Sequence, residues 1–111
     1  MNSMKVSELT RDGVCRPLTL PDGDREITGV YIGDLLSWVM GRAGADEAWI
    51  TIMSNVNVVA VAALADTAYV LFAEGVTPDG GVIETATQKG INLLVSDRSA
   101  YELAVWLHQQ L

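Results

Sequence analysis

The chain has 111 residues, half of them apolar, so it can pack one domain around a core and is not expected to be disordered. Its formal net charge of −7 disfavours binding to nucleic acid and to anionic membrane surfaces, because both require a basic surface. The single cysteine, Cys15, excludes a disulfide within the chain and argues against a zinc or iron–sulfur centre built from several thiolates of one chain.

The N-terminal part of the sequence predicts a short helix and an edge strand. Residues 4–9 suit a helix with Val6 and Leu9 turned inward, and a loosely alternating strand follows at 14–20. Pro17 lies in that strand and favours an edge position, because proline has no N–H to donate to a second neighbour. Residues 20–24 then predict a turn, since they combine proline, glycine and aspartate.

From residue 27 onward, short β-rich runs alternate with helical runs. Strands are expected at 27–32, 49–53, 68–72 and 91–95, and helices from about residue 35, over 57–65, from about residue 78 and from residue 99. This alternation is typical of βαβ units. The predicted fold class is therefore α/β with a mainly parallel central sheet.

Several residues mark the ends of these helices. Asp34 is predicted to cap the helix that follows the first of the four strands, and Pro78 is expected near the first position of the third helix. Gly90 is expected to end that helix. Ser99 and Glu102 match a capping box, which predicts the start of the last helix.

Three of the expected helices bear on association between chains. The run 57–65 is apolar on all sides, which predicts burial between two layers or against a partner chain. Trp38 and Trp106 are large aromatic residues of the kind that interfaces use, so a homodimer is expected. In the helix before 57–65, the stripe that should face inward consists of Leu35, Leu36, Val39 and Met40.

The run that begins at Asp24 and Arg25 and continues to Thr28 and Gly29 resembles the signature of the DRTGG domain family. Two residues intervene before Thr28, and Val30 stands where the signature has its second glycine. Further runs that resemble the family follow in the same order, at 33–36, 49–52, 57–62 and 91–97. They extend from residue 24 to residue 97, so the resemblance spans most of the chain.

The resemblance implies a three-layer αβα fold, similar to the N-terminal domains of HPr kinase/phosphorylase and of Mur ligases, with 1–111 as a single domain. It also implies self-association. DRTGG modules occur fused to CBS-domain pyrophosphatases and to phosphotransacetylase-like proteins, where other domains carry the catalysis; here the module is expected to stand alone. Short relatives are labelled hydrogenase-associated or iron–sulfur proteins. Because Cys15 alone cannot hold a cluster, an accessory role beside a metabolic or redox enzyme is implied.

Candidate ligand-binding residues occur mainly in the connections that follow the strands. Ligands of open parallel sheets bind beyond the carboxyl ends of the strands, at helix N-termini. The candidates, two of them from the signature, are Thr28, Gly29, Gly33, Asp34, Thr51, Ser54, Asn55, Asn57, Asp97 and Ser99. They predict either a small nucleotide-like ligand or ordinary helix capping, which uses the same residue types. Glu74 and Asp79 add negative charge, which is unfavourable for a phosphate unless a metal intervenes.

The signature itself also has two interpretations. The guanidinium of Arg25 can bind a carboxylate or a phosphate, or it can order a turn by hydrogen bonding to backbone carbonyls. The pair Thr28 and Gly29 inside a strand indicates a close backbone approach or a bulge. These structural readings do not require a ligand.

No catalytic residue, metal site or cofactor is predicted. Cys15 has no adjacent histidine to act as its base, and His108 is expected to be solvated near the end of the last helix. Neither a P-loop nor a dinucleotide-binding fingerprint is found. The sequence favours a non-catalytic regulatory or scaffolding module. A small-ligand sensor is the alternative, and a hydrolase or transferase is the least favoured hypothesis.

The expected location is the cytoplasm. The chain does not open with a basic segment, an apolar run and a cleavage site, so no signal peptide is expected. Its most apolar stretch, 56–72, is interrupted by Asp66 and Thr67, and each half is too short to span a bilayer.

Overall fold

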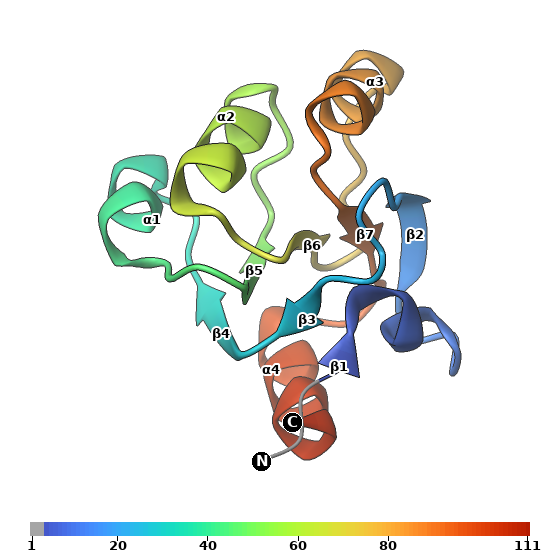
Figure 1. The fold of residues 1–111 in the computed structure, drawn as a ribbon. Helices are drawn as coiled ribbons and strands as arrows, with labels where there is room; N and C mark the ends of the chain where they lie inside the picture. Colours follow the sequence, from blue (N-terminus) through green and yellow to red (C-terminus); the bar gives the residue numbers. More distant parts are fainter. Residues whose placement is uncertain (1–3) are drawn as a thin grey trace.

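A computed structural model describes residues 4–111 of the chain as three layers of helix, sheet and helix (Figure 1). The N-terminal elements are β1 (Met4–Lys5), the 3₁₀-helix η1 (Val6–Thr10), β2 (Arg16–Thr19) and β3 (Glu26–Ile27). The alternating part consists of β4 (Gly29–Ile32), α1 (Leu36–Arg42), β5 (Glu47–Thr51), α2 (Asn57–Ala65), β6 (Tyr69–Phe72), α3 (Gly80–Lys89), β7 (Leu93–Val95) and α4 (Ala100–Gln110).

The central sheet has the strand order β2-β7-β6-β5-β4. Strands β4 to β7 are parallel to one another, and β2 pairs antiparallel with β7 at one edge. The order advances by one strand at each crossover, so right-handed crossovers place α1, α2 and α3 on the same face (Figure 1). The chain then crosses to the other face, where α4 packs near η1 and the short β1–β3 ribbon. The α/β fold class is confirmed.

Two hydrophobic cores fill the spaces on either side of the sheet. Alternate residues of one strand enter opposite cores: Trp49 packs with α1 and α2, whereas Ile50 packs with η1 and α4. All four residues of β6 are buried, as expected for a central strand that is covered on both faces. This alternation explains why the strands read as continuous apolar runs in the sequence.

The termini of α3 and α4 agree with the sequence, apart from the place of Pro78. Ser99 and Glu102 form the predicted capping box of α4. Gly90 ends α3 in the left-handed conformation, with φ of 74°, which glycine adopts without steric cost. Pro78 lies one residue before the N-cap, because the side chain of Asp79 caps α3 by accepting a hydrogen bond from Val82 N.

Other local predictions need correction. The expected helix at 4–9 is the shorter η1, preceded by β1, and the expected strand at 27–32 is divided at Thr28 into β3 and β4, which belong to different sheets. Asp34 does not cap α1, whose N-cap is Leu35. Leu35 and Met40, expected to face inward, are about half exposed.

Candidate functional site

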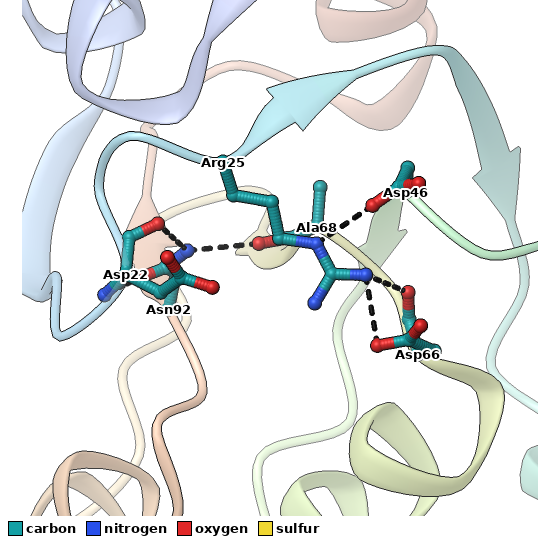
Figure 2. A network of polar contacts seen from close by, with 6 residues as sticks. All are labelled: Asp22, Arg25, Asp46, Asp66, Ala68 and Asn92. Atoms are coloured by element: carbon teal, nitrogen blue, oxygen red, sulfur yellow. Dashed lines mark hydrogen bonds and ion pairs between the residues drawn. The ribbon is translucent and has the colours of Figure 1, made fainter.

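The signature residue Arg25 lies at the amino edge of the parallel sheet, where β5, β6 and β7 begin (Figure 2). Its Nε donates to Asp46 Oδ1 at 2.8 Å, in the connection before β5. Its Nη2 donates to Asp66 Oδ1 at 2.8 Å and also to the backbone carbonyl of Asp66, which ends α2. Arg25 thus ties two connections to the loop that carries the signature.

These contacts stabilise the positive charge of Arg25 and the backbone conformation of its two partners. Burial opposes the positive charge of Arg25, but the hydrogen bonds and charges of Asp66 and Asp46 outweigh it, so the pKa of Arg25 is raised above its ordinary value. Asp46 and Asp66 both have left-handed backbone, with φ of 65° and 60°. Non-glycine residues pay a steric penalty there, so the guanidinium holds two strained turns in place.

Asn92 fixes the other side of the same loop (Figure 2). Its Oδ1 accepts from Asp22 N, and its Nδ2 donates to the carbonyls of Asp22 and Ala68, each at 2.9 Å. Asn92 is only 1% exposed, and backbone groups satisfy three of the hydrogen-bonding positions of its side chain. The amino edge is therefore a closed polar network whose groups bind one another.

The candidates Thr28 and Gly29 belong to this amino edge. Thr28 N donates to the carbonyl of Asp46 at 3.0 Å. A Cβ added at Gly29 would lie 3.0 Å from Glu47 Oε2, which is a tight contact, so the glycine permits close approach of that side chain. Of the two interpretations of the signature, the structural one matches these contacts.

Asp34 joins the carboxyl ends of β4 and β5. Its Oδ1 accepts from Thr51 Oγ1 at 2.7 Å and from Ile52 N at 3.0 Å, and Trp49 Nε1 donates to the carbonyl of Gly33 at 2.8 Å. Gly33, Asp34 and Thr51 are thus brought together. Here the Asp34 carboxylate satisfies an amide beyond the end of β5 instead of the amides of α1.

The remaining candidates are spread along the same edge. Asn55 Oδ1 accepts from Asn57 N at 2.9 Å in the connection after β5, where Ser54 also lies. Ser99 caps α4, and Asp97 pairs with Arg16 at 3.3 Å. Asp34 follows β4 and Asp97 follows β7, and two strands separate them, so the two connections are roughly 14 Å apart. The candidates do not converge on one point.

The sequence did not predict a pocket that lies beside the carboxyl end of β7. It measures about 190 Å³ and is bounded by residues 12–16 and by the connection 96–98, with Arg16, Arg98, Asp12 and Asp97 in its lining. Antiparallel pairing of β2 with β7 brings these segments together, with Arg16 opposite Val95. Only the strand order could have revealed it.

The described residues hold little that could act as a nucleophile or bind a metal. Burial raises the pKa of the Cys15 thiol to about 12, the charge of Asp12 adds to this effect and that of Arg98 opposes it, so the thiol stays protonated at neutral pH. His108 is exposed on α4. Among residues 4–111 we find no group of three or more metal-ligating side chains, and no helix with the length and apolar character that a bilayer crossing requires.

Apolar side chains are exposed at the end of the sheet formed by β4 and β5. We define the β4–α1 surface as Ile32, Leu35, Trp38, Met40, Ile52 and Val56, each about half exposed. Pairing of β4 with β5 and packing of α1 against α2 bring these segments side by side (Figure 1). Helix α1 buries only Val39, and the guanidinium of Arg42 lies 3.8 Å from the Trp38 ring centre.

Known proteins share the fold of this chain. A scan against protein-family models gives no match, and neither does a search of curated proteins. The CBS and DRTGG domains of the regulatory region of Clostridium perfringens pyrophosphatase, in complex with the activator diadenosine tetraphosphate, match with a TM-score of 0.73 at 13% identity. The match covers 87% of this chain and 43% of that chain, so this chain spans less than half of the neighbour's length. The likeness establishes a DRTGG-like fold.

Proposed function

We propose that the chain is a non-catalytic regulatory or scaffolding module of DRTGG type, a single cytoplasmic domain that associates with a second copy of itself and serves a metabolic or redox enzyme as an accessory. A hydrogenase-linked enzyme is one candidate. The observation that carries the proposal is the β4–α1 surface. Trp38 is 53% exposed and Leu35, the N-cap of α1, is 57% exposed. Helix α1 thus leaves large apolar side chains uncovered beside α2. Exposed apolar side chains that neighbouring segments bring near one another support an interaction site at this end of the sheet.

The two edges of the sheet differ in a way that favours β4 as the associating edge. At the β2 edge, the strand contains Arg16 and Pro17 and its register with β7 shifts between Pro17 and Thr19; these features discourage pairing with another chain. Strand β4 consists of Gly29–Ile32, without charge or proline, and pairs only with β5 within the described chain. Two copies related by a twofold axis can pair their β4 strands antiparallel.

Charge also favours this face. The chain carries −7, so two copies repel each other over most of their surface. Segment 29–45 contains one acidic residue, Asp34, and one basic residue, Arg42. Self-association through this segment brings few like charges together, and Asp34 is already engaged by Thr51.

Native mass spectrometry and light scattering of the purified chain test the proposal. We expect a dimer that Trp38→Glu converts to a monomer, because the change places a charge in the interface. The control is Tyr101→Glu, on the exposed side of α4, which should remain dimeric. A wild-type chain that is monomeric at high micromolar concentration, or loss of the dimer in both variants, would contradict self-association through this surface.

The accessory role predicts that an enzyme co-purifies with Tyr101→Glu but not with Trp38→Glu.

The second candidate function is a sensor of a small, nucleotide-like ligand that binds at one part of the carboxyl edge, along which Asp34, Asn55, Asn57 and Asp97 are spread. The solved neighbour, a regulatory region in complex with diadenosine tetraphosphate, favours this role. A screen by thermal shift tests it, since a ligand that binds only the folded chain raises the melting temperature. Stabilisation by nucleotides is the expected result; a melting temperature that no small molecule changes would contradict the sensor.

A further inference from the structure

The pocket between residues 12–16 and 96–98 differs from the rest of this acidic molecule in its charge. Two arginines, Arg16 and Arg98, line it together with two aspartates, Asp12 and Asp97. The lining is therefore neutral overall but contains both signs, in a chain whose net charge is −7. A lining of this kind is complementary to a ligand that itself carries one positive and one negative group.

The charges of the pocket are only partly used within the described chain. Arg16 and Asp97 form an ion pair at 3.3 Å, with side chains 55% and 79% exposed, so the pair contributes little to stability and a ligand can replace it. No ion pair within residues 4–111 engages Arg98 or Asp12. One cation and one anion in the lining are thus available to a ligand.

Ser96 forms the buried floor of this site and holds the backbone of Arg98. It lines the pocket, it is 0% exposed, and its Oγ accepts a hydrogen bond from Arg98 N at 3.2 Å. The exposed cation above this floor is the Arg98 side chain, which lies close to the N-terminus of α4 and favours a carboxylate at this end of the pocket.

The size of the pocket restricts the ligand. Its volume of about 190 Å³ is below the range of roughly 300–1,000 Å³ found for drug-sized ligands, so a whole nucleotide does not fit inside it. The two aspartates also oppose a polyphosphate, which would bring several negative charges beside them. A small molecule with a carboxylate and an ammonium group meets both the volume and the charges.

We infer that this pocket binds a small zwitterion of the α-amino-acid class, with its carboxylate at Arg98 and its ammonium group at Asp12 and Asp97. The inference rests on the second proposed role only in so far as both place a small ligand at the carboxyl edge of the sheet, and it goes beyond that role by assigning an amino acid, not a nucleotide, to this pocket. It is independent of self-association. The ligand would connect the segment before β2 with the segment before α4. It would thereby link the edge strand of the sheet to the helix on the face opposite α1, α2 and α3.

The inference is tested by titration calorimetry and thermal shift of the full chain with glycine, L-alanine and L-serine. The comparison compounds are acetate, ethylamine, inorganic phosphate, AMP and ATP. We expect an amino acid to bind and to raise the melting temperature, while acetate and ethylamine, which each carry half of its charges, have no effect. Arg98→Gln should weaken binding at least about tenfold, the factor typical for loss of a charge-assisted hydrogen bond, and Asp12→Asn should weaken it as well. Lys89→Gln, at the end of α3 and outside the pocket lining, is the control and should bind normally.

Other outcomes separate the inference from the proposed functions. Binding of nucleotides without binding of amino acids would overturn the zwitterion site and retain the sensor. Stronger binding of phosphate in Asp12→Asn than in the wild-type chain, without amino-acid binding, would also overturn it, because the site would then be a simple anion site. An unchanged melting temperature with every compound would overturn both the site and the sensor. None of these outcomes alters the prediction that Trp38→Glu separates a dimer.

Discussion

The two edges of the parallel sheet use similar polar residues for different purposes. At the amino edge, Arg25 and Asn92 bind backbone and carboxylate groups of three connections, and their hydrogen bonds measure 2.9 Å or less. At the carboxyl edge, Arg98 makes no ion pair within the described residues, and Arg16 makes one that is largely exposed. The first edge is closed on itself, whereas the second retains groups that a ligand can use.

The sequence signature and the polar groups that are free to bind a ligand therefore lie at opposite edges of the sheet. The signature loop is held by contacts that stabilise the start of β5, β6 and β7, so we attribute its pattern to folding. Parallel sheets usually bind ligands at the carboxyl ends of their strands, and the pocket lies there. Substitutions of the same type at the two edges therefore measure the contrast directly.

The largest effect is expected for Asn92→Ala. The change leaves Asp22 N and the carbonyls of Asp22 and Ala68 without their partner; the bonds to Asp22 are partly buried and the one to Ala68 is buried, so we expect the free energy of unfolding to fall by about 3 kcal/mol. Denaturant unfolding followed by circular dichroism measures it. The matched control at the carboxyl edge is Asn55→Ala, which removes one exposed hydrogen bond and should cost less than about 1 kcal/mol. Equal losses in the two variants would remove the proposed contrast.

Arg25→Gln should have the next largest effect, a loss of about 2 kcal/mol in the free energy of unfolding. Arg25 is 19% exposed, but Asp46 and Asp66 are more exposed, so water compensates part of the lost ion pairs. Arg25→Lys should recover part of the loss, since it keeps the charge but not the two-sided geometry. A lysine variant as stable as the wild-type chain would show that charge alone matters here.

Asp34→Ala should lower the free energy of unfolding by about 1 kcal/mol, through loss of its hydrogen bonds to Thr51 Oγ1 and Ile52 N. A helix cap would contribute a similar amount, so stability alone does not distinguish the two roles. Amide hydrogen exchange does. We expect faster exchange at Ile52 and unchanged exchange in the first turn of α1; the reverse pattern would restore the capping interpretation.

Local sequence patterns were sufficient for the existence of β4 to β7, the capping box at Ser99 and the helix stop at Gly90, because these depend on neighbours within a few residues. They predicted neither β1 nor the division of 27–32 into β3 and β4. They were insufficient for the partners of Arg25, since Asp46 and Asp66 lie 21 and 41 residues away and meet it only through the strand order. The pocket escaped prediction for the same reason. The helical stripe of α1 was predicted to face inward because periodicity identifies an apolar face without showing whether another layer covers it.

The smallest effect on stability is expected for Arg98→Gln, the same substitution as at Arg25 but at the open edge. The backbone of Arg98 is held independently of its side chain, through its carbonyl, which accepts from Glu74 N at 2.8 Å, and through Arg98 N, which donates to Ser96 Oγ. Removing the guanidinium should therefore change the free energy of unfolding by no more than about 0.5 kcal/mol, as for an exposed side chain without partners. Denaturant unfolding in parallel with Arg25→Gln measures the difference. A loss at Arg98 as large as at Arg25 would mean that its side chain is also part of the fold, and the contrast between a closed and an open edge would then fail.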